Sequence, residues 1–280
     1  MSTEQKKVRK INWRMIMVNT MAALGAIALF SLLGFANRNQ KNVFCRHLNV
    51  SLVNPIEHNF VSAERIKKQI QAEFDSLEGT PIENIRVSEI HRLVASMGEI
   101  REAHVFTTVD GECIVEVKQR IPVARIINAD GRSFYLDTEG FAMPLSDQYS
   151  ADVPLFTGEL SESLTTKSVS EMVADSAFTS KSLLDDIMHI AGYLRSNDFW
   201  NAQVEHINVR NREFEIVPRV GNHRIVLGDS SDLDEKFRKL MAFYVKVLPV
   251  RDINIYKTIN LKYEGQVVCE ERLAYQALTH

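Results

Sequence analysis

The sequence predicts an α+β protein with a single transmembrane helix, a small domain of order β-α-α-β-β, and a β-rich domain whose twisted, mostly antiparallel sheet carries flanking helices. Three observations lead to this fold class. A long apolar run lies near the start, strand and helix periods then follow in that order, and the rest carries short strands between turn residues. Residues 38–280 are long for one compact unit, so we expect two domains outside the membrane.

The membrane helix is predicted over residues 15–37, a stretch of 23 residues without a charged side chain. At about 1.5 Å per helical residue, this length crosses a hydrocarbon core of roughly 30 Å. The preceding residues 1–14 carry five Lys and Arg against one acid. The positive-inside rule therefore predicts that this basic tail stays in the cytoplasm.

A cleavable signal peptide is the alternative to a membrane anchor. Gly34-Phe35-Ala36 resembles a cleavage site that would be cut before Asn37. A cleavable apolar region usually has about 7–15 residues, and this run is longer. We therefore expect an uncleaved anchor, which makes the chain a single-pass protein with its bulk outside the cytoplasm.

Composition limits the classes of partner. Beyond the basic tail, 28 Lys and Arg (33 minus 5) stand against 35 Asp and Glu (36 minus 1), a formal balance of −7. An acidic exterior offers no electrostatic footprint for nucleic acid, which we do not expect as a partner. Cys45, Cys113 and Cys269 are too few and too scattered for a disulfide framework or a zinc site, and a single disulfide is left open.

The first exterior domain is predicted over residues 45–120. Residues from Cys45 alternate as a half-buried strand, Ser62 is placed to cap a helix, and Asp110-Gly111 is a strong hairpin turn. The expected elements are a strand near 45–52, a helix from Ser62 to about residue 77, a helix over Val87–Met97 that Gly98 ends, and strands over Ile100–Val109 and Glu112–Lys118.

The second domain is predicted over residues 121–272. Pro122 should end the last strand of the first domain and begin a connection, because proline cannot donate to a ladder. Residues 158–180 indicate a connection with at most a short helix. Farther along we expect helices over Lys181–Asn197 and Asp232–Val247, and strands over 205–209, 212–217, 223–227, 253–263 and 266–269, before a short tail at 273–280.

Several motifs then resemble a known family. The β-α-α-β-β order directly after a membrane anchor resembles a POTRA domain. The run VEVKQRIPVA at Val115–Ala124 is similar to the V-x-V-x-E-R-x-P-V-A signature of the FtsQ/DivIB family of bacterial cell-division proteins, with Gln119 where that family commonly has glutamate. Residues 134–141 match the family's L-V-D-x-x-G-x-x-F element loosely, and residues 153–158 match its L-P-x-L-x-G element well.

The resemblance implies a non-enzymatic scaffold of the division machinery, held in the plasma (inner) membrane at the division septum. Such a scaffold would bind the small bitopic coiled-coil proteins FtsB and FtsL and help to localise and regulate septal peptidoglycan synthesis. We expect binding by strand addition, in which an extended partner segment pairs with an unpaired sheet edge.

The resemblance also implies which residues bind the partner. Leu261-Lys262-Tyr263 is similar to the L-R-Y at the start of the family's partner-binding region. Lys262 would meet an acidic partner residue, and Tyr263 would pack against the partner. The exposed edge itself would consist of Gln266, Val267 and Val268. The alternative is an ordinary closing strand with a solvated lysine.

No residue set in the sequence predicts catalysis, a metal site, a cofactor or a small-molecule substrate. Acids gather where the last helix begins, where carboxylates cap free N–H groups and meet the positive end of the helix dipole. They are Asp229, Asp232, Asp234 and Glu235. Gly228-Asp229-Ser230 resembles part of an esterase nucleophile block, but it lies late in a β-rich domain and not after the first strand of a parallel sheet.

Two other functions stay as alternatives. A POTRA domain on a bitopic anchor could serve as a polypeptide receptor or chaperone of the envelope, which predicts several tandem POTRA units where the sequence has one. A secreted hydrolase would need cleavage at Gly34-Phe35-Ala36 and a cleft that holds Asp229, Ser230 and a histidine.

Overall fold

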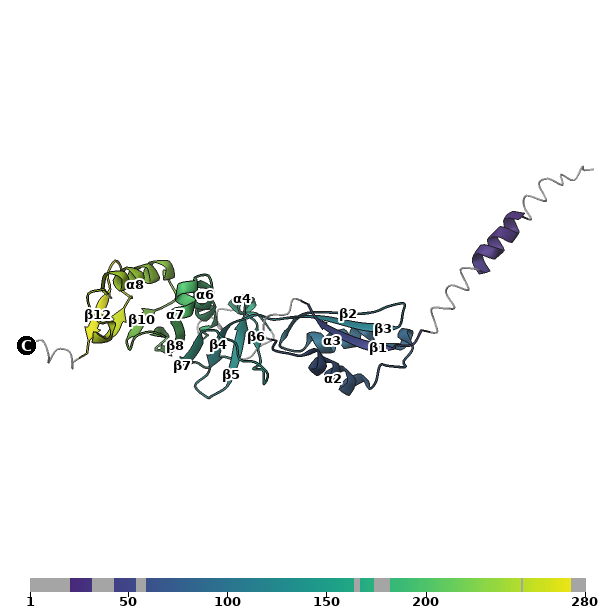
Figure 1. Ribbon diagram of the computed structural model, residues 1–280, viewed down its shortest axis with the longest axis horizontal. Helices are drawn as coiled ribbons and strands as arrows, with labels where there is room; N and C mark the ends of the chain where they lie inside the picture. Colours follow the sequence, from purple (N-terminus) through teal and green to yellow (C-terminus); the bar gives the residue numbers. More distant parts are fainter. Residues whose placement is uncertain are drawn as a thin grey trace, which may run out of the picture.

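The computed structural model describes residues 21–31, 43–53, 59–163, 167–173, 182–247 and 249–272 (Figure 1). The predicted tails 1–14 and 273–280 lie outside the described residues. Of the predicted membrane span 15–37, residues 21–31 are described and are helical, whereas 15–20 and 32–37 fall outside. Among the helices of the described part, none is both long and apolar enough to cross a membrane.

The first folded unit is a three-stranded sheet covered by two helices. Its elements are β1 (His47–Leu52), α2 (Ala63–Phe74), a 3₁₀ turn at Ile82–Asn84, α3 (Val87–Ala95), β2 (Ile100–Thr107) and β3 (Glu112–Gln119). The strand order is β1-β3-β2, with β1 parallel and β2 antiparallel to β3. This confirms the predicted β-α-α-β-β order.

Local sequence explains the turns and caps of this unit. The Ser62 hydroxyl accepts a first-turn N–H and caps α2 as predicted. Asp110-Gly111 turns the β2–β3 hairpin, and Gly111 has φ +90°; a Cβ there would lie 2.5 Å from the carbonyl oxygen of Phe44. Gly98 does not end α3, because the helix already ends at Ala95 and the hydroxyl of the next residue, Ser96, donates to the carbonyl oxygen of Leu93.

The second unit is a nine-stranded mixed sheet with helices packed on it. Its strands are β4 (Pro122–Ile127), β5 (Ser133–Asp137), β6 (Ala142–Met143), β7 (Leu155–Gly158), β8 (Val204–Arg210), β9 (Glu213–Pro218), β10 (Arg224–Gly228), β11 (Tyr256–Asn260) and β12 (Val268–Glu271). Its helices are α4 (Val169–Val173), α6 (Leu184–Arg195), α7 (Asp198–Gln203) and α8 (Leu233–Val247), with a 3₁₀ turn at Ile253–Ile255.

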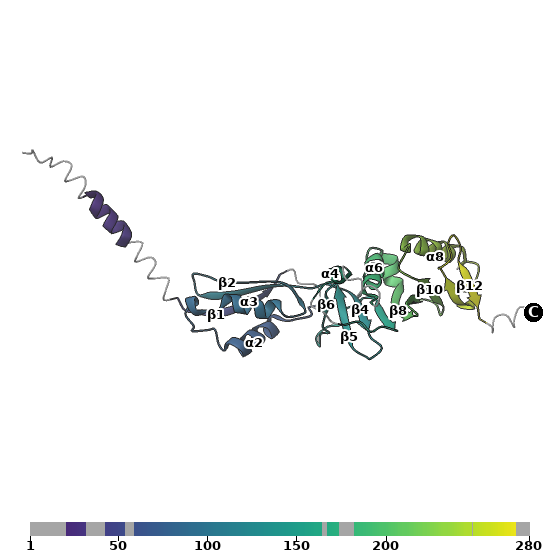
Figure 2. The ribbon, with the colours of Figure 1, turned by 180° about the vertical axis from the view of Figure 1, so that it is seen from behind.

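The strand order of this sheet is β12-β11-β10-β9-β8-β7-β4-β5-β6. Of its eight strand pairs, β4–β7, β7–β8 and β10–β11 are parallel and the other five are antiparallel. The predicted mostly antiparallel sheet is therefore confirmed. In both views α6 and α8 lie on the same side of the strands (Figures 1 and 2).

The core of the second unit lies between the sheet and these helices. Trp200 of α7 packs against Phe237 and Tyr244 of α8, and Tyr193 of α6 stacks on Phe237 with ring centroids 4.8 Å apart. Phe237 is fully buried, and burying such a side chain stabilises a fold by about 1.5–3 kcal/mol. These contacts hold α8 firmly against the rest of the unit.

Three predicted boundaries are wrong for local reasons. Pro122 does not begin a connection; it is the first residue of β4 and pairs with Asp137, at a strand end where proline is tolerated. The helix predicted over 181–197 covers Leu184–Arg195, and Asn197 then caps α7 by accepting the N–H of Trp200. The strand predicted over 253–263 is a 3₁₀ turn followed by the shorter β11.

A buried junction joins the two units. Phe60, just before α2, is 1% exposed and packs edge-on against Tyr135 of β5 and against Tyr149. Its backbone N–H donates to the side-chain oxygen of Gln119 at 2.8 Å, and its carbonyl oxygen accepts the hydroxyl of Ser146 at 2.7 Å. Both units supply these contacts, so the segment before α2 packs the first unit against the second.

Candidate partner-binding edge

β12 is the last strand of the nine-stranded sheet and lies at the end of the folded part remote from the first unit (Figures 1 and 2). It runs antiparallel to β11, with Val268 opposite Asn260 and Cys269 opposite Ile259. On its other side, no strand of the described chain pairs with it. An unpaired edge presents a row of backbone N–H and C=O groups, which is the geometry that strand addition needs.

The structure places the first three predicted binding residues at the end of β11. Leu261 is fully buried, and its N–H donates to the carbonyl oxygen of Val226 at 2.9 Å, so this residue anchors the loop in the core. Lys262 and Tyr263 lie on the exposed loop that follows, where Tyr263 is 50% exposed. A partner can therefore reach Lys262 and Tyr263, but not the Leu261 side chain.

The other three predicted residues lie at the start of β12. The sequence predicts a strand over 266–269, whereas β12 covers Val268–Glu271, so Gln266 and Val267 precede it. Because Leu261 stays bonded to β10, the chain turns at Glu264-Gly265 and needs two more residues before it pairs back with β11. Val267 packs against the core, and Val268 is 44% exposed at the start of the edge strand.

Lys262 already has an ion-pair partner within the chain. Its Nζ lies 2.5 Å from Oε1 of Glu213 on β9, and the two side chains are 40% and 43% exposed. The hydrogen bond with Glu213 raises the pKa of Lys262, so this lysine is fully protonated at neutral pH. Its stem runs over Gly228, where a Cβ would lie 2.8 Å from Cγ of Lys262.

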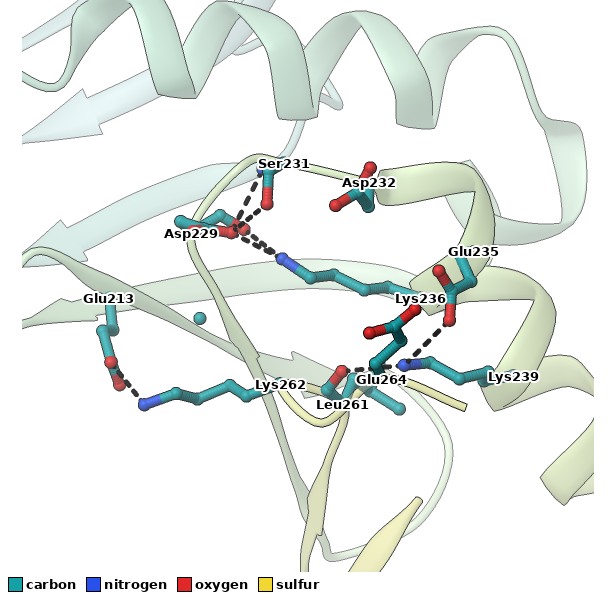
Figure 3. A pocket seen from close by; sticks show the side chains of 11 residues that line it. Glu213, Asp229, Ser231, Asp232, Glu235, Lys236, Lys239, Leu261, Lys262 and Glu264 are labelled. Carbon is teal, nitrogen blue, oxygen red and sulfur yellow. Dashed lines mark hydrogen bonds and ion pairs between the residues drawn. The ribbon is translucent and has the colours of Figure 1, made fainter. Parts of the chain in front are cut away.

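A charged pocket of about 500 Å³ lies between the first turns of α8 and the β11–β12 loop (Figure 3). Each of its three lysines is bonded to a carboxylate: Lys236 to Asp229, Lys239 to Glu235 and Lys262 to Glu213. The hydrogen bond from Lys236 lowers the pKa of Asp229 to about 2. The three lysines of the pocket are therefore already paired within the chain, with partners on the turn before α8, on α8 itself and on β9.

The residues that suggested a reactive group order the turn between β10 and α8. Asp229 accepts hydrogen bonds from Lys236 and from the Ser231 hydroxyl, and the Ser230 hydroxyl donates to Asp186 of α6 at 2.5 Å. Within the part of the chain that the structure describes, no group of three or more His, Cys, Asp or Glu is placed to hold a metal ion. The three cysteines are free thiols.

Sequence reasoning missed Glu213 and Lys239, and it gave Glu235 only a role at the start of the last helix. The Lys239 ammonium donates to the carbonyl oxygens of Leu261 at 3.2 Å and of Tyr263 at 2.6 Å. The i, i+4 spacing of Glu235 and Lys239 signals a helical ion pair. Nothing local in the sequence signals the bonds from Lys239 to a loop 22 and 24 residues away.

Comparisons with known proteins fit this architecture. Residues 121–270 match the family model described as FtsQ/DivIB, C-terminal related, and residues 43–118 match the model of a POTRA-like domain. The chain belongs to the FtsQ/DivIB family. Two relatives named cell division protein FtsQ agree. The relative from Salinibacter ruber is 30% identical over 199 residues, which cover 69% of this chain and 73% of the relative. The relative from Rhodothermus marinus is 24% identical over 178 residues, which cover 61% of this chain and 60% of the relative.

The FtsQ/DivIB signature lies at the junction between the two units. Gln119 bonds to the backbone of Phe60, and the next residue, Arg120, donates to Asp137 of β5 at 2.7 Å. The element at 153–158 ends at Gly158, whose φ is +101°. The run around Gln119 and Arg120 therefore builds the contact between the POTRA-like unit and the nine-stranded sheet, whereas Gly158 lies close against Val209 of β8 inside that sheet.

Proposed function

We propose that this FtsQ/DivIB chain is a non-enzymatic scaffold of the division machinery, which binds small bitopic coiled-coil proteins of the FtsB and FtsL type by strand addition to β12. The observation that carries the proposal is the open edge of β12. A partner strand paired there gains backbone hydrogen bonds, each with a net value of about 0.5–1.5 kcal/mol. It displaces no strand of the described sheet.

Side chains next to the edge supply specificity in this proposal. Tyr263 is half exposed on the loop before β12, and Val268 offers an apolar side chain where the strand begins. Tyrosine is enriched among the interface residues that carry most of the binding energy. We expect Tyr263 to pack against the partner. Gln266 and Val267 would lie next to the partner segment where it reaches the edge of β12.

Lys262 adds charge selectivity. An exposed ion pair such as Lys262–Glu213 contributes only about 0–1 kcal/mol, so an acidic partner residue can share or take over the ammonium with little loss. Lys262→Glu would place two carboxylates side by side and would repel both Glu213 and the acidic partner residue.

The proposal places the chain in the inner membrane at the division septum, anchored through residues 15–37 with residues 1–14 in the cytoplasm. The apolar run and the family membership support this placement. β12 lies at the end of the folded part farthest from the helix at 21–31 (Figure 1). From there the chain would help to localise and regulate septal peptidoglycan synthesis by holding its partners away from the membrane.

Binding of the full-length chain to a peptide from the membrane-distal segment of an FtsB-like protein tests the proposal. Tyr263→Ala and Lys262→Glu should each weaken binding about ten-fold, which is roughly 1.4 kcal/mol. Phe199→Ala is the matched control, because Phe199 is 49% exposed and lies on α7 beside β8. Unchanged affinity in both edge variants would refute partner binding at this edge.

A further inference from the structure

We propose that Lys239 and Glu235, on the first two turns of α8, position β12 for partner binding without touching the partner. The inference rests on the proposed function and adds the residues that keep its binding strand in place. The loop between β11 and β12, residues 261–267, connects the edge strand in sequence to the rest of the sheet.

Side chains of α8 bind this loop at three backbone positions, Leu261, Tyr263 and Gly265. Figure 3 shows Lys239 between Glu235 and Leu261. The Lys239 ammonium donates to the carbonyl oxygens of Leu261 and Tyr263, at 3.2 and 2.6 Å. The N–H of Gly265 donates to Oε1 of Glu235 at 3.4 Å, and the same oxygen lies 3.5 Å from the Lys239 nitrogen. One helical ion pair thus holds the start and the middle of the loop.

The side chain of Lys239 is only 12% exposed, so it acts from inside the fold. Tyr263, whose carbonyl oxygen Lys239 binds, is half exposed. A partner that lies along β12 can therefore contact Tyr263, whereas Lys239 works through the backbone of the loop. Loss of the ammonium would leave two carbonyl oxygens without their donor.

The position of β12 depends on these bonds from α8 to the loop, because the strand is short and pairs with one neighbouring strand, β11. It has four residues, and its register with β11 is irregular between Tyr256 and Thr258. Edge strands with few neighbours open locally at low free energy. If β12 is in place for only a fraction of the time, the apparent affinity for a partner falls to that fraction of its intrinsic value.

Lys236 is a matched control on the same helix. Its side chain is 9% exposed, and its ammonium bonds to a carbonyl oxygen and a carboxylate, both of Asp229. These bonds end in the turn between β10 and α8, whereas those of Lys239 end in the loop before β12. The two lysines therefore match in burial and chemistry and differ in what they hold.

Amide hydrogen exchange of the free full-length chain tests the positioning role without a partner. Lys239→Met should speed exchange of residues 264–271 about ten-fold, and Glu235→Ala should do so more weakly. Lys236→Met should leave these amides at their wild-type rate relative to the rest of the sheet. Lys239→Arg, which restores a cationic donor, should restore slow exchange. Equal effects of the two Met variants on β12, or no effect of Lys239→Met, would overturn the proposal.

Affinity for the FtsB-like peptide completes the test. Lys239→Met should weaken binding about ten-fold, with Lys239→Arg close to wild type. Tyr263→Ala should weaken binding while exchange in free β12 stays unchanged. If Tyr263→Ala weakens binding but Lys239→Met binds like wild type, the positioning role fails and the proposed function stands. If Tyr263→Ala and Lys262→Glu both bind like wild type, the two proposals fall together.

Discussion

The side-chain oxygen of Gln119 accepts the backbone N–H of Phe60 at 2.8 Å and that of Val61 at 3.2 Å. Gln119 ends β3 of the POTRA-like unit, and the Phe60 ring is buried against the nine-stranded sheet. The Gln119 amide nitrogen also donates to Oδ1 of Asn59 at 2.7 Å. A single buried side chain therefore holds the segment through which the two units meet.

Replacing Gln119 by alanine should destabilise the chain by about 2–4 kcal/mol, because two buried N–H groups lose their acceptor. Gln119→Glu should cost much less. Its carboxylate accepts the same two N–H groups, and the Asn59 amide can turn to donate to it. Urea unfolding of both variants checks this difference. Equal losses in the two variants would contradict the role given to the side-chain oxygen.

Arg120 and Asp137 form the second contact of the junction. Asp137 is 1% exposed, and the Arg120 guanidinium lies 4.2 Å from the centre of the Phe141 ring. Arg120→Met leaves a buried carboxylate without its cation and should lower the free energy of unfolding by about 3 kcal/mol. Arg132→Met, which removes an exposed pair with Asp130, should change the free energy of unfolding far less, because water screens the exposed pair. Chemical denaturation that gave similar losses for both would count against a buried junction pair.

Gly158 should tolerate no side chain. Its φ is +101°, and a Cβ would lie 2.2 Å from the carbonyl oxygen of Val209, so Gly158→Ala combines backbone strain with a clash. We expect a loss of about 3 kcal/mol or more. Gly131→Ala is the control, because Gly131 has φ +85° but open space around it, and should cost about 1–2 kcal/mol. Thermal unfolding of the Gly158→Ala and Gly131→Ala variants measures the two losses of stability. Equal losses would exclude the clash at Gly158.

Stability should depend on pH through His223. Burial lowers the pKa of this histidine from its ordinary 6.5 to about 4, and Nε2 lies 2.8 Å from the Tyr244 hydroxyl. As pH falls, the unfolded chain binds the proton before the folded chain does. Stability is therefore full above about pH 6.5 and falls between about pH 6.5 and 4, by up to roughly 3 kcal/mol.

The variant His223→Gln checks this assignment. It keeps a polar group near Tyr244 but cannot titrate in this range. The difference in unfolding free energy between pH 7.5 and pH 4.5, measured with denaturant, should shrink in the variant. A difference as large as in the parent chain would show that other groups carry the pH dependence.

The POTRA-like unit was predictable because its signals are local. Ser62 caps the helix that follows it, and Asp110-Gly111 turns the hairpin beside it. The boundaries that failed depend on contacts farther away. Pro122 continues into β4 because Asp137 is available as its partner on β5, and no pattern around residue 122 encodes that pairing.

The candidate edge was predicted in the right segment but two residues early. β12 begins after a loop whose carbonyl oxygens at Leu261 and Tyr263 bind Lys239 of α8, 22 and 24 residues away in sequence. The Lys262–Glu213 pair joins residues 49 apart, and Gln119 joins Phe60 across 59 residues. Such contacts arise only when the sheet is assembled, so sequence periodicity indicates the strand but not what holds it.

Amide hydrogen exchange of β12, measured with and without the FtsB-like peptide, decides whether the partner pairs with this strand. Strand addition predicts that exchange of Val268–Glu271 in the full-length chain slows strongly when the peptide binds. The opposite edge of the same sheet, Ala142–Met143 of β6, should stay unchanged. Peptide binding that protects another surface and leaves Val268–Glu271 at its free rate would contradict the account.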